Sequence, residues 1–234
     1  MKSELTSTVV GELAARLRRD IALGVLEPGA RLNIEVLKRE RKVSHPSIRE
    51  ALALLAGEGY VSAKDNRGYR VLESSFEDLK DTTRLRAELE KIGLRWSIKN
   101  TNTDWRASVV AAHHTLSEVE AEMVTDSKAF AIEWDERNKQ FHLALIGNCQ
   151  SPRLIEAVSS FYDLTRRYRL MAYSTVHSDH RNWLNRSASE HSDLKDYALA
   201  GNAGAGCALL GEHVTKSVAE TQAAVLSLSK ARPR

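Results

Sequence analysis

The stretch VSHPSIREALALL, residues 43–55, constrains the fold of this chain more than any other segment. Its apolar residues Ile48, Leu52 and Leu55 recur at helical spacing, so they predict a helix with one buried stripe. Such a helix packs on a core through one side and leaves its other side available to a partner. The residues at its start indicate what that partner is.

The start of this helix combines capping residues with hydrogen-bond donors. Ser44 and Ser47 both suit an N-cap, and Glu50 follows Ser47 at the spacing of a capping box. The same end presents His45 and Arg49, and a short helix with a cationic, hydrogen-bonding N-terminal end fits the major groove of DNA. The alternative is an ordinary surface helix with a solvated run of charges.

The flanking segments predict a small DNA-binding fold around this helix. Apolar residues at helical spacing predict one helix over residues 9–22 and another around residues 34–37. The helical period is then lost, and residues 60–63 and 69–72 predict two short strands joined by a turn that contains Gly68. Three helices followed by a hairpin form a winged helix-turn-helix.

The tip of the predicted wing and the distribution of charge agree with this interpretation. Arg67 lies beside Gly68, and a glycine permits close approach of the backbone to a phosphate or a minor-groove edge. The alternative is a plain structural turn. Residues 1–75 hold 13 Lys and Arg against 10 Asp and Glu, whereas the remainder holds 21 of each. The excess positive charge in the first third is typical of a nucleic-acid-binding module attached to a neutral domain.

The rest of the chain predicts an all-α helical bundle. After a short polar joint, six segments with helical periodicity and no strand pattern occupy residues 76–230. We therefore expect a mainly α protein with two domains, a winged helix-turn-helix over residues 1–73 and an all-helical domain over residues 76–230. The first apolar stripe that we expect in the bundle core consists of Leu79, Thr82, Leu85, Leu89, Ile92 and Trp96.

Two further features of the sequence indicate the cellular compartment. The chain has no long apolar run, and its first residues lack the apolar core of a signal peptide, so a cytoplasmic location is expected. Cys149 and Cys207 lie far apart without the spacing of a redox motif, which favours reduced thiols.

Three histidines and an asparagine of the predicted bundle can converge on one point. His142 follows Asn138 by four residues, so both side chains leave the same face of a helix. His191 and His213 each lie eleven residues from the turn centred near residue 202, and equal distance from a turn places two residues of an antiparallel pair at the same height. Three imidazoles and an amide oxygen suit Zn²⁺, or a neighbouring divalent metal such as Ni²⁺ or Mn²⁺, with positions left open.

Several alternatives to this site exist. Asp135 competes with Asn138 as a ligand, but it precedes His142 by two helical turns, about 10.5 Å, which favours Asn138. Each histidine could instead be an ordinary hydrogen-bonded residue. A metal-dependent hydrolytic enzyme would need an acid or base over the open position; Glu190 is expected on a different helix face, and no nucleophile motif is present. We therefore expect no enzyme activity.

The N-terminal part of the chain resembles the GntR family of bacterial transcription regulators. The family signature reads IxxGxLxPGxxL, then VSRxPVREALxxLxxEG, then GxxV. The matching residues are Ile21, Gly24, Leu26, Pro28, Gly29, Leu32, Val43, Ser44, Ile48, Arg49, Glu50, Ala51, Leu52, Leu55, Glu58, Gly59, Gly68 and Val71. The resemblance implies DNA contacts from Arg49, Ser44, His45, Ser47 and Gly68. The family usually has arginine where this chain has His45, so the operator sequence is not carried over.

The helical part is similar to the FCD effector domain of the FadR subgroup. The subgroup's motif D/NxxFHxxL matches Asn138, Phe141, His142 and Leu145, and its Glu-His pair matches Glu190 and His191, with His213 in the final helix. Its RxxLE motif matches Arg86, Leu89 and Glu90, and this arginine usually faces the effector cavity. Arg167 and Arg169 are further positively charged side chains that could bind a carboxylate.

The overall similarity extends to the carbon-starvation-induced repressors of the FCD group, which look like sensors of five-carbon dicarboxylates such as glutarate or 2-hydroxyglutarate. The resemblance thus implies a homodimeric repressor that binds operator DNA and is released by a dicarboxylate bound beside a divalent metal. The alternative is a regulator in which the metal is purely structural.

Overall fold

The computed structural model describes residues 9–64, 68–73, 75–173 and 180–231. The chain divides into two compact units, Met1–Ser75 and Phe76–Arg234, called here the N-terminal unit and the helical unit. The described part of the chain is mainly α-helical with one small sheet, which confirms the predicted fold class.

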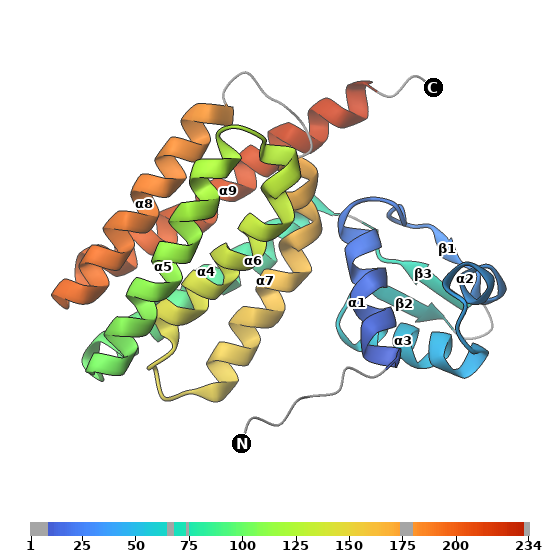
Figure 1. Ribbon diagram of the computed structural model, residues 1–234, viewed down its shortest axis with the longest axis horizontal. Helices are drawn as coiled ribbons and strands as arrows, with labels where there is room; N and C mark the ends of the chain where they lie inside the picture. The colour runs from blue at the N-terminus through green and yellow to red at the C-terminus, as the bar shows by residue number, and fades with distance from the viewer. Residues whose placement is uncertain (1–8, 65–67, 74, 174–179, 232–234) are drawn as a thin grey trace. The chain divides into compact units, whose positions relative to one another are not determined.

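The described residues of the N-terminal unit form three helices and three short strands (Figure 1). Its elements are α1 (Val9–Ala22), β1 (Arg31–Leu32), α2 (Ile34–Arg41), α3 (His45–Gly57), β2 (Val61–Lys64) and β3 (Gly68–Val71). The antiparallel sheet has the strand order β1-β3-β2, with Arg31 opposite Arg70 and Val61 opposite Val71. Strand β1 was not predicted, because two residues are too few for an alternating pattern.

The core of the N-terminal unit consists of apolar and aromatic side chains. Ile48, Leu52 and Leu55 of α3 are fully buried, which confirms the predicted stripe, and Leu17 of α1 packs in the same core. Among the described residues of this unit, every buried side chain is apolar or aromatic. Its stability therefore rests on ordinary hydrophobic burial.

The turn between α2 and α3 is fixed by two local features. Lys42 has a left-handed backbone, with φ of 52°, and ends α2. Ser44 is the N-cap of α3, because its Oγ accepts a hydrogen bond from the backbone N–H of Ser47 at 3.2 Å. The capping box that the sequence allowed between Ser47 and Glu50 is wrong, since both residues lie inside the helix.

The helical unit is a bundle in which six described helices pack together (Figure 1). They are α4 (Phe76–Lys99), α5 (Thr103–Met123), α6 (Ser127–Ile146), α7 (Pro152–Tyr173), α8 (His180–Ala200) and α9 (Ala203–Ala231). Helix α4 packs mainly against α7 and α9, and α5 packs against α6 and α8. No helix in the described residues is both long and apolar enough to cross a membrane.

The buried face of α4 differs from the predicted stripe. Leu85 and Trp96 are 48% and 42% exposed, whereas Arg86 and Glu90 are buried. Leu79 and Thr82 are buried as predicted, but the prediction was wrong for Leu85 and Trp96, because the inner face there holds a buried pair of charged residues that hydrophobicity does not mark. Gly93 belongs to this inner face and allows α4 to approach its neighbours closely.

Candidate metal and effector site

The predicted DNA-contacting residues lie around the start of α3. Arg49 is exposed on this helix. His45 is partly exposed, and its Nε2 lies 3.7 Å from a carboxylate oxygen of Glu35. The hydroxyl groups of Ser44 and Ser47 lie 2.8 Å apart, so both are engaged at the helix start.

The wing carries the remaining predicted contact. Gly68 is exposed at the start of β3 and has a φ of 73°, a conformation that glycine adopts without strain. Arg67 lies outside the described residues.

Three histidines from three helices meet inside the helical unit. His142 of α6, His191 of α8 and His213 of α9 each offer a ring nitrogen, and these atoms all lie within 4.8 Å of one another. The Nε2 atoms of His191 and His213 are 3.1 Å apart, and the ring centroids of His142 and His213 are 5.4 Å apart. The structure thus brings together the three imidazoles that the sequence placed at one point.

Each of these imidazoles is held by a carboxylate through its other nitrogen. The pairs are His142 Nδ1 with Glu90 Oε2 at 2.6 Å, His191 Nδ1 with Glu120 Oε1 at 2.7 Å, and His213 Nδ1 with Glu190 Oε2 at 2.7 Å. A carboxylate that accepts the Nδ1 proton leaves a lone pair on Nε2, which is the arrangement found around metal-binding histidines.

The facing Nε2 atoms provide a test of whether a cation suits this site. When both Nδ1 atoms donate to carboxylates, the Nε2 atoms of His191 and His213 carry facing lone pairs 3.1 Å apart, which a bound cation would bridge; in the other tautomer of either ring, the same distance is that of an N–H···N hydrogen bond. Two nitrogen ligands of a tetrahedral zinc ion lie about 3.3 Å apart, given a Zn–N distance of about 2.0–2.1 Å. The separation of the two rings therefore fits a bound divalent ion.

Asn138 lines the same cavity as His142 and His213. Its Nδ2 donates to the hydroxyl of Tyr162 at 2.9 Å, and this hydroxyl donates to the backbone carbonyl of Asp135 at 3.1 Å. The amide oxygen is thereby turned away from Tyr162. Asn138 Oδ1 and His142 Nε2 are both buried, and neither has a hydrogen-bond partner in the described part of the chain.

Asp135, the competing candidate ligand, is occupied elsewhere. Its Oδ1 accepts from Arg169 Nε at 2.7 Å, and its Oδ2 lies 3.0 Å from Arg166 Nε. Both oxygens thus face arginines of α7, which leaves Asn138 as the better placed oxygen donor.

Burial keeps the imidazoles of His142 and His191 neutral. It lowers the pKa of His142 to about 3, and the pKa of His191 also lies well below its ordinary value. Burial alone would raise the pKa of Glu90, but Arg86 and His142 outweigh it and lower that pKa to about 2. Burial raises the pKa of Glu120 to about 7. A neutral imidazole has the free lone pair that a metal ligand needs.

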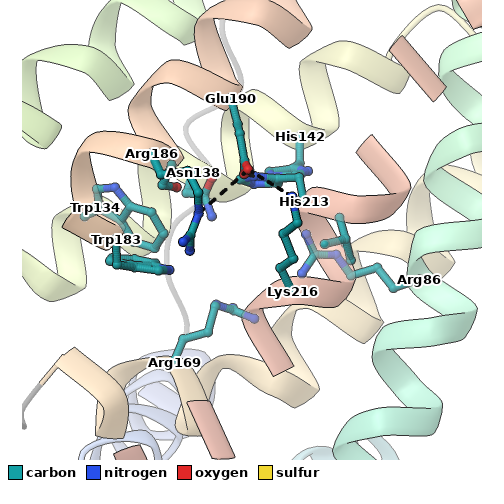
Figure 2. A pocket seen from close by; sticks show the side chains of 12 residues that line it. Arg86, Trp134, Asn138, His142, Arg169, Trp183, Arg186, Glu190, His213 and Lys216 are labelled. Carbon is teal, nitrogen blue, oxygen red and sulfur yellow. Dashed lines mark hydrogen bonds and ion pairs between the residues drawn. The ribbon is translucent and has the colours of Figure 1, made fainter. Parts of the chain in front are cut away.

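A cavity opens beside the histidines (Figure 2). Its empty volume is about 440 Å³, which includes the open mouth. It is lined by Arg86, Trp134, Asn138, His142, Arg169, Trp183, Arg186, Ser187, Glu190, His213, Val214 and Lys216. The predicted Arg86 and Arg169 therefore face this space, whereas the side chain of Arg167 lies outside the described residues.

The two inner arginines are held in fixed positions. The guanidinium carbons of Arg86 and Arg169 lie 4.4 Å and 3.8 Å from the centroid of the Tyr162 ring. Arg86 also pairs with Glu90 at 2.5 Å, while Arg169 donates to Thr165 and to backbone and carboxylate oxygens. Two guanidinium groups held in place beside a histidine cluster that could bind a metal are suited chemically to an anion.

Arg186, Lys216 and the carboxylate of Glu190 were missed by the sequence analysis. Arg186 precedes Glu190 by four residues and Lys216 follows His213 by three, so helical spacing was the available signal. Glu190 was expected on a face away from the site, but it lines the cavity. The reason is that α8 packs against both α5 and α9, so both of its adjacent residues 190 and 191 point inward.

Comparison with protein families divides the chain as its structure does. Residues 10–71 match the family described as bacterial regulatory proteins, gntR family, and residues 81–216 match the FCD domain. The second match covers more than half of the chain.

Individual proteins are similar over most of their length. The uncharacterized HTH-type transcriptional regulator BphR of Paraburkholderia xenovorans (strain LB400) is 35% identical over 87% of this chain and 81% of its own. The HTH-type transcriptional repressor GlaR of Escherichia coli (strain K12) is 31% identical over 77% of this chain and 76% of its own.

Solved structures share the fold. E. coli McbR/YncC superposes with a TM-score of 0.73 at 19% identity, covering 92% of this chain and 98% of its own. A putative transcriptional regulator GntR from Rhodococcus sp. RHA1 gives a TM-score of 0.69 at 23% identity, covering 92% of this chain and 97% of its own. At these identities the likeness concerns the fold alone.

Proposed function

The chain belongs to the GntR family of bacterial regulatory proteins and carries an FCD domain, and on that premise we propose that it is a homodimeric repressor released from operator DNA by a small carboxylate. Its family is one of DNA-binding transcriptional regulators rather than enzymes. The proposal adds the direction of control, the class of effector and the role of a metal.

One observation carries the sensing half of the proposal. The buried imidazoles of His142 and His191 and the partly buried imidazole of His213 all have their Nδ1 atoms paired with carboxylates, and the Nε2 atoms of His191 and His213 lie 3.1 Å apart. His142, His191, His213 and the oxygen of Asn138 would hold a divalent ion, and Zn²⁺ suits this donor set. Such an ion supplies open positions that accept a carboxylate oxygen.

The side chains around the cavity then select an acid. Arg86 and Arg169 lie beside the cluster and direct their charge at the same space (Figure 2). A guanidinium binds a carboxylate through two parallel hydrogen bonds, so these residues orient the acid against the cluster. A five-carbon dicarboxylate such as glutarate or 2-hydroxyglutarate is the class that we propose.

The DNA-binding half rests on α3. The exposed Arg49 is the residue that we propose to contact a base edge or a phosphate, with Ser44, His45 and Ser47 beside it and Gly68 in the wing. Two such helices in a dimer would read two half-sites of an inverted repeat. By linkage, an acid that lowers the affinity for DNA is itself bound more weakly, by the same factor, when DNA is bound.

A mobility-shift experiment tests both halves. The probe is the duplex DNA that the protein itself selects from a random pool, and we expect an inverted repeat in it. Arg49→Ala should weaken binding of this duplex roughly 10- to 100-fold, because a guanidinium contact is lost in each half-site. Glutarate should release the Zn²⁺-loaded wild-type protein from the duplex, and chelation should abolish this response.

The complementary variant separates the two modules. His142→Ala should bind the duplex like the wild type but should lose the response to glutarate. His114→Ala is the matched control, because this histidine of α5 has a 70% exposed side chain away from the cluster. If the acid has no effect on the metal-loaded wild type while chelation unfolds the helical unit, the metal is structural and the sensing half is wrong.

A further inference from the structure

Glu190 is shared between the histidine cluster and two cations of the cavity. Its Oε2 accepts from His213 Nδ1 at 2.7 Å, while its Oε1 lies 3.5 Å from Lys216 Nζ and 3.8 Å from Arg186 Nε. Figure 2 shows these groups converging on the carboxylate from α8 and α9. Glu190 therefore acts as an anion built into the wall of the cavity.

The cations of the cavity fall into an inner and an outer pair. The inner side chains, Arg86 and Arg169, are only 6% and 8% exposed and lie 2.5 Å and 2.7 Å from their carboxylate partners. The outer side chains, Arg186 and Lys216, are 45% and 48% exposed. The distances from Glu190 to these cations exceed the roughly 2.7–2.9 Å of a charge-assisted hydrogen bond, so both ion pairs are loose, and Lys216 Nζ lies equally far, 3.5 Å, from Glu212 Oε2.

An apolar wall lies in the same cavity. Trp134 and Trp183 contact each other edge to face, with ring centroids 5.7 Å apart, and both line the cavity. Two indoles suit a short hydrocarbon segment better than a polar one. The cavity thus offers cations at two places and an apolar surface.

From this arrangement we infer that Arg186 and Lys216 form a second anion subsite, which binds the distal carboxylate of the effector. The inference rests on the proposed function, in which the first carboxylate is bound beside the histidines. Glu190 occupies the second subsite as an internal anion, and the distal carboxylate takes over its two cations. The expected ligand therefore has two carboxylates joined by a short apolar chain.

This exchange also provides a link between the ligand and the packing of two helices. Glu190 belongs to α8 and is bonded to His213 of α9, while Lys216 is one turn further along α9. Drawing Lys216 away from Glu190 removes one of the contacts that join α8 to α9, whereas the pair of Arg186 with Glu190 lies within α8. An acid with one carboxylate leaves these contacts in place.

Calorimetric titration of the Zn²⁺-loaded full chain tests the second subsite. The probes are glutarate and pentanoate, which share a five-carbon chain but carry two and one carboxylates. The wild type should prefer glutarate by at least roughly tenfold. Arg186→Gln and Lys216→Gln should each weaken glutarate roughly tenfold, because each removes a charged hydrogen-bond donor, and should leave pentanoate binding unchanged.

Controls keep the result interpretable. Arg153→Gln removes the same charge from a side chain that is 92% exposed, and it should change neither affinity. Arg186→Lys should retain most of the preference for glutarate, since the charge remains. Glu190→Gln, measured at saturating Zn²⁺, should bind glutarate several-fold more tightly, because the internal anion loses its charge.

Two different failures can be distinguished. In the first failure, the wild type prefers glutarate, but Arg186→Gln and Lys216→Gln either keep that preference or weaken the binding of glutarate and pentanoate equally. The second subsite is then wrong and the proposed function stands. If the Zn²⁺-loaded wild type binds neither acid, the carboxylate sensor of the proposed function is wrong, and the second subsite is overturned with it.

Discussion

The interiors of the two units are built from different residues. In the described part of the N-terminal unit, all buried side chains are apolar or aromatic, whereas the helical unit buries arginines, glutamates, histidines and an aspartate. The first unit thus uses its interior for stability and carries its functional residues on the surface. The second unit places its functional residues inside, so its stability depends on charge pairing and pH.

The largest expected contrast between the units comes from removing one carboxylate in each. Asp135→Ala leaves the buried guanidinium of Arg169 without its carboxylate partner and should lower the unfolding free energy by about 3–5 kcal/mol. Glu58→Ala removes a pair with Arg18 whose side chains are 34% and 38% exposed, and should cost at most about 1 kcal/mol.

Urea unfolding measures this contrast. All four tryptophans, at positions 96, 105, 134 and 183, belong to the helical unit, so their fluorescence reports on that unit alone. Far-UV circular dichroism follows Glu58→Ala. Equal losses in the two variants would mean that burial of the pair does not decide its strength.

A glycine in each unit provides a second comparison. An alanine Cβ at Gly93 would lie 2.8 Å from Ile146 Cβ and 3.0 Å from Leu154 Cδ2, so Gly93→Ala should destabilise the helical unit by about 1–3 kcal/mol. At Gly57 of α3, nothing lies within 4 Å of the added Cβ, and Gly57→Ala should stabilise by about 0.4–1 kcal/mol. Thermal unfolding of both variants checks the opposite signs, and a stabilising Gly93→Ala would contradict the close packing of α4.

Lowering the pH by one unit should reduce the unfolding free energy of the metal-free helical unit, by less than the Asp135→Ala substitution does. The pKa values of His142 and His191 are lowered in the fold, so below about pH 6.5 the unfolded chain binds two more protons at these residues. The pKa of Glu120 is raised to about 7, so at this residue the folded state binds one more. The net of about one proton over these three residues predicts a loss of about 1.4 kcal/mol as the pH falls from 6 to 5, and the lowered pKa values of His113 and Glu90 add to this loss.

Tryptophan-monitored urea titrations in a chelator at these two pH values measure the loss. A rise in stability over this interval would show that Glu120 outweighs the two imidazoles.

The difference between the two interiors also explains what could be predicted from the sequence. The N-terminal unit follows apolar periodicity, so its helices and hairpin could be predicted, and only the two-residue β1 was missed. In the helical unit, the convergence of His142, His191 and His213 followed from spacing and the turn between α8 and α9. The inner face of α4 could not be predicted, because Arg86 and Glu90 are buried only through partners on other helices.

In the hydrogen-bond chain from Asn138 through Tyr162 to Asp135, the side chains alone do not decide which group donates and which accepts. Its last member is a main-chain carbonyl, which can only accept, so the phenol must give its proton there and must receive one from the amide. Through these two hydrogen bonds, the backbone carbonyl of Asp135 in α6 sets which atom of the Asn138 amide points to Tyr162 and which is left without a partner in the described part of the chain. Because every residue type has that carbonyl, replacing the side chain at position 135 would leave this polarity intact.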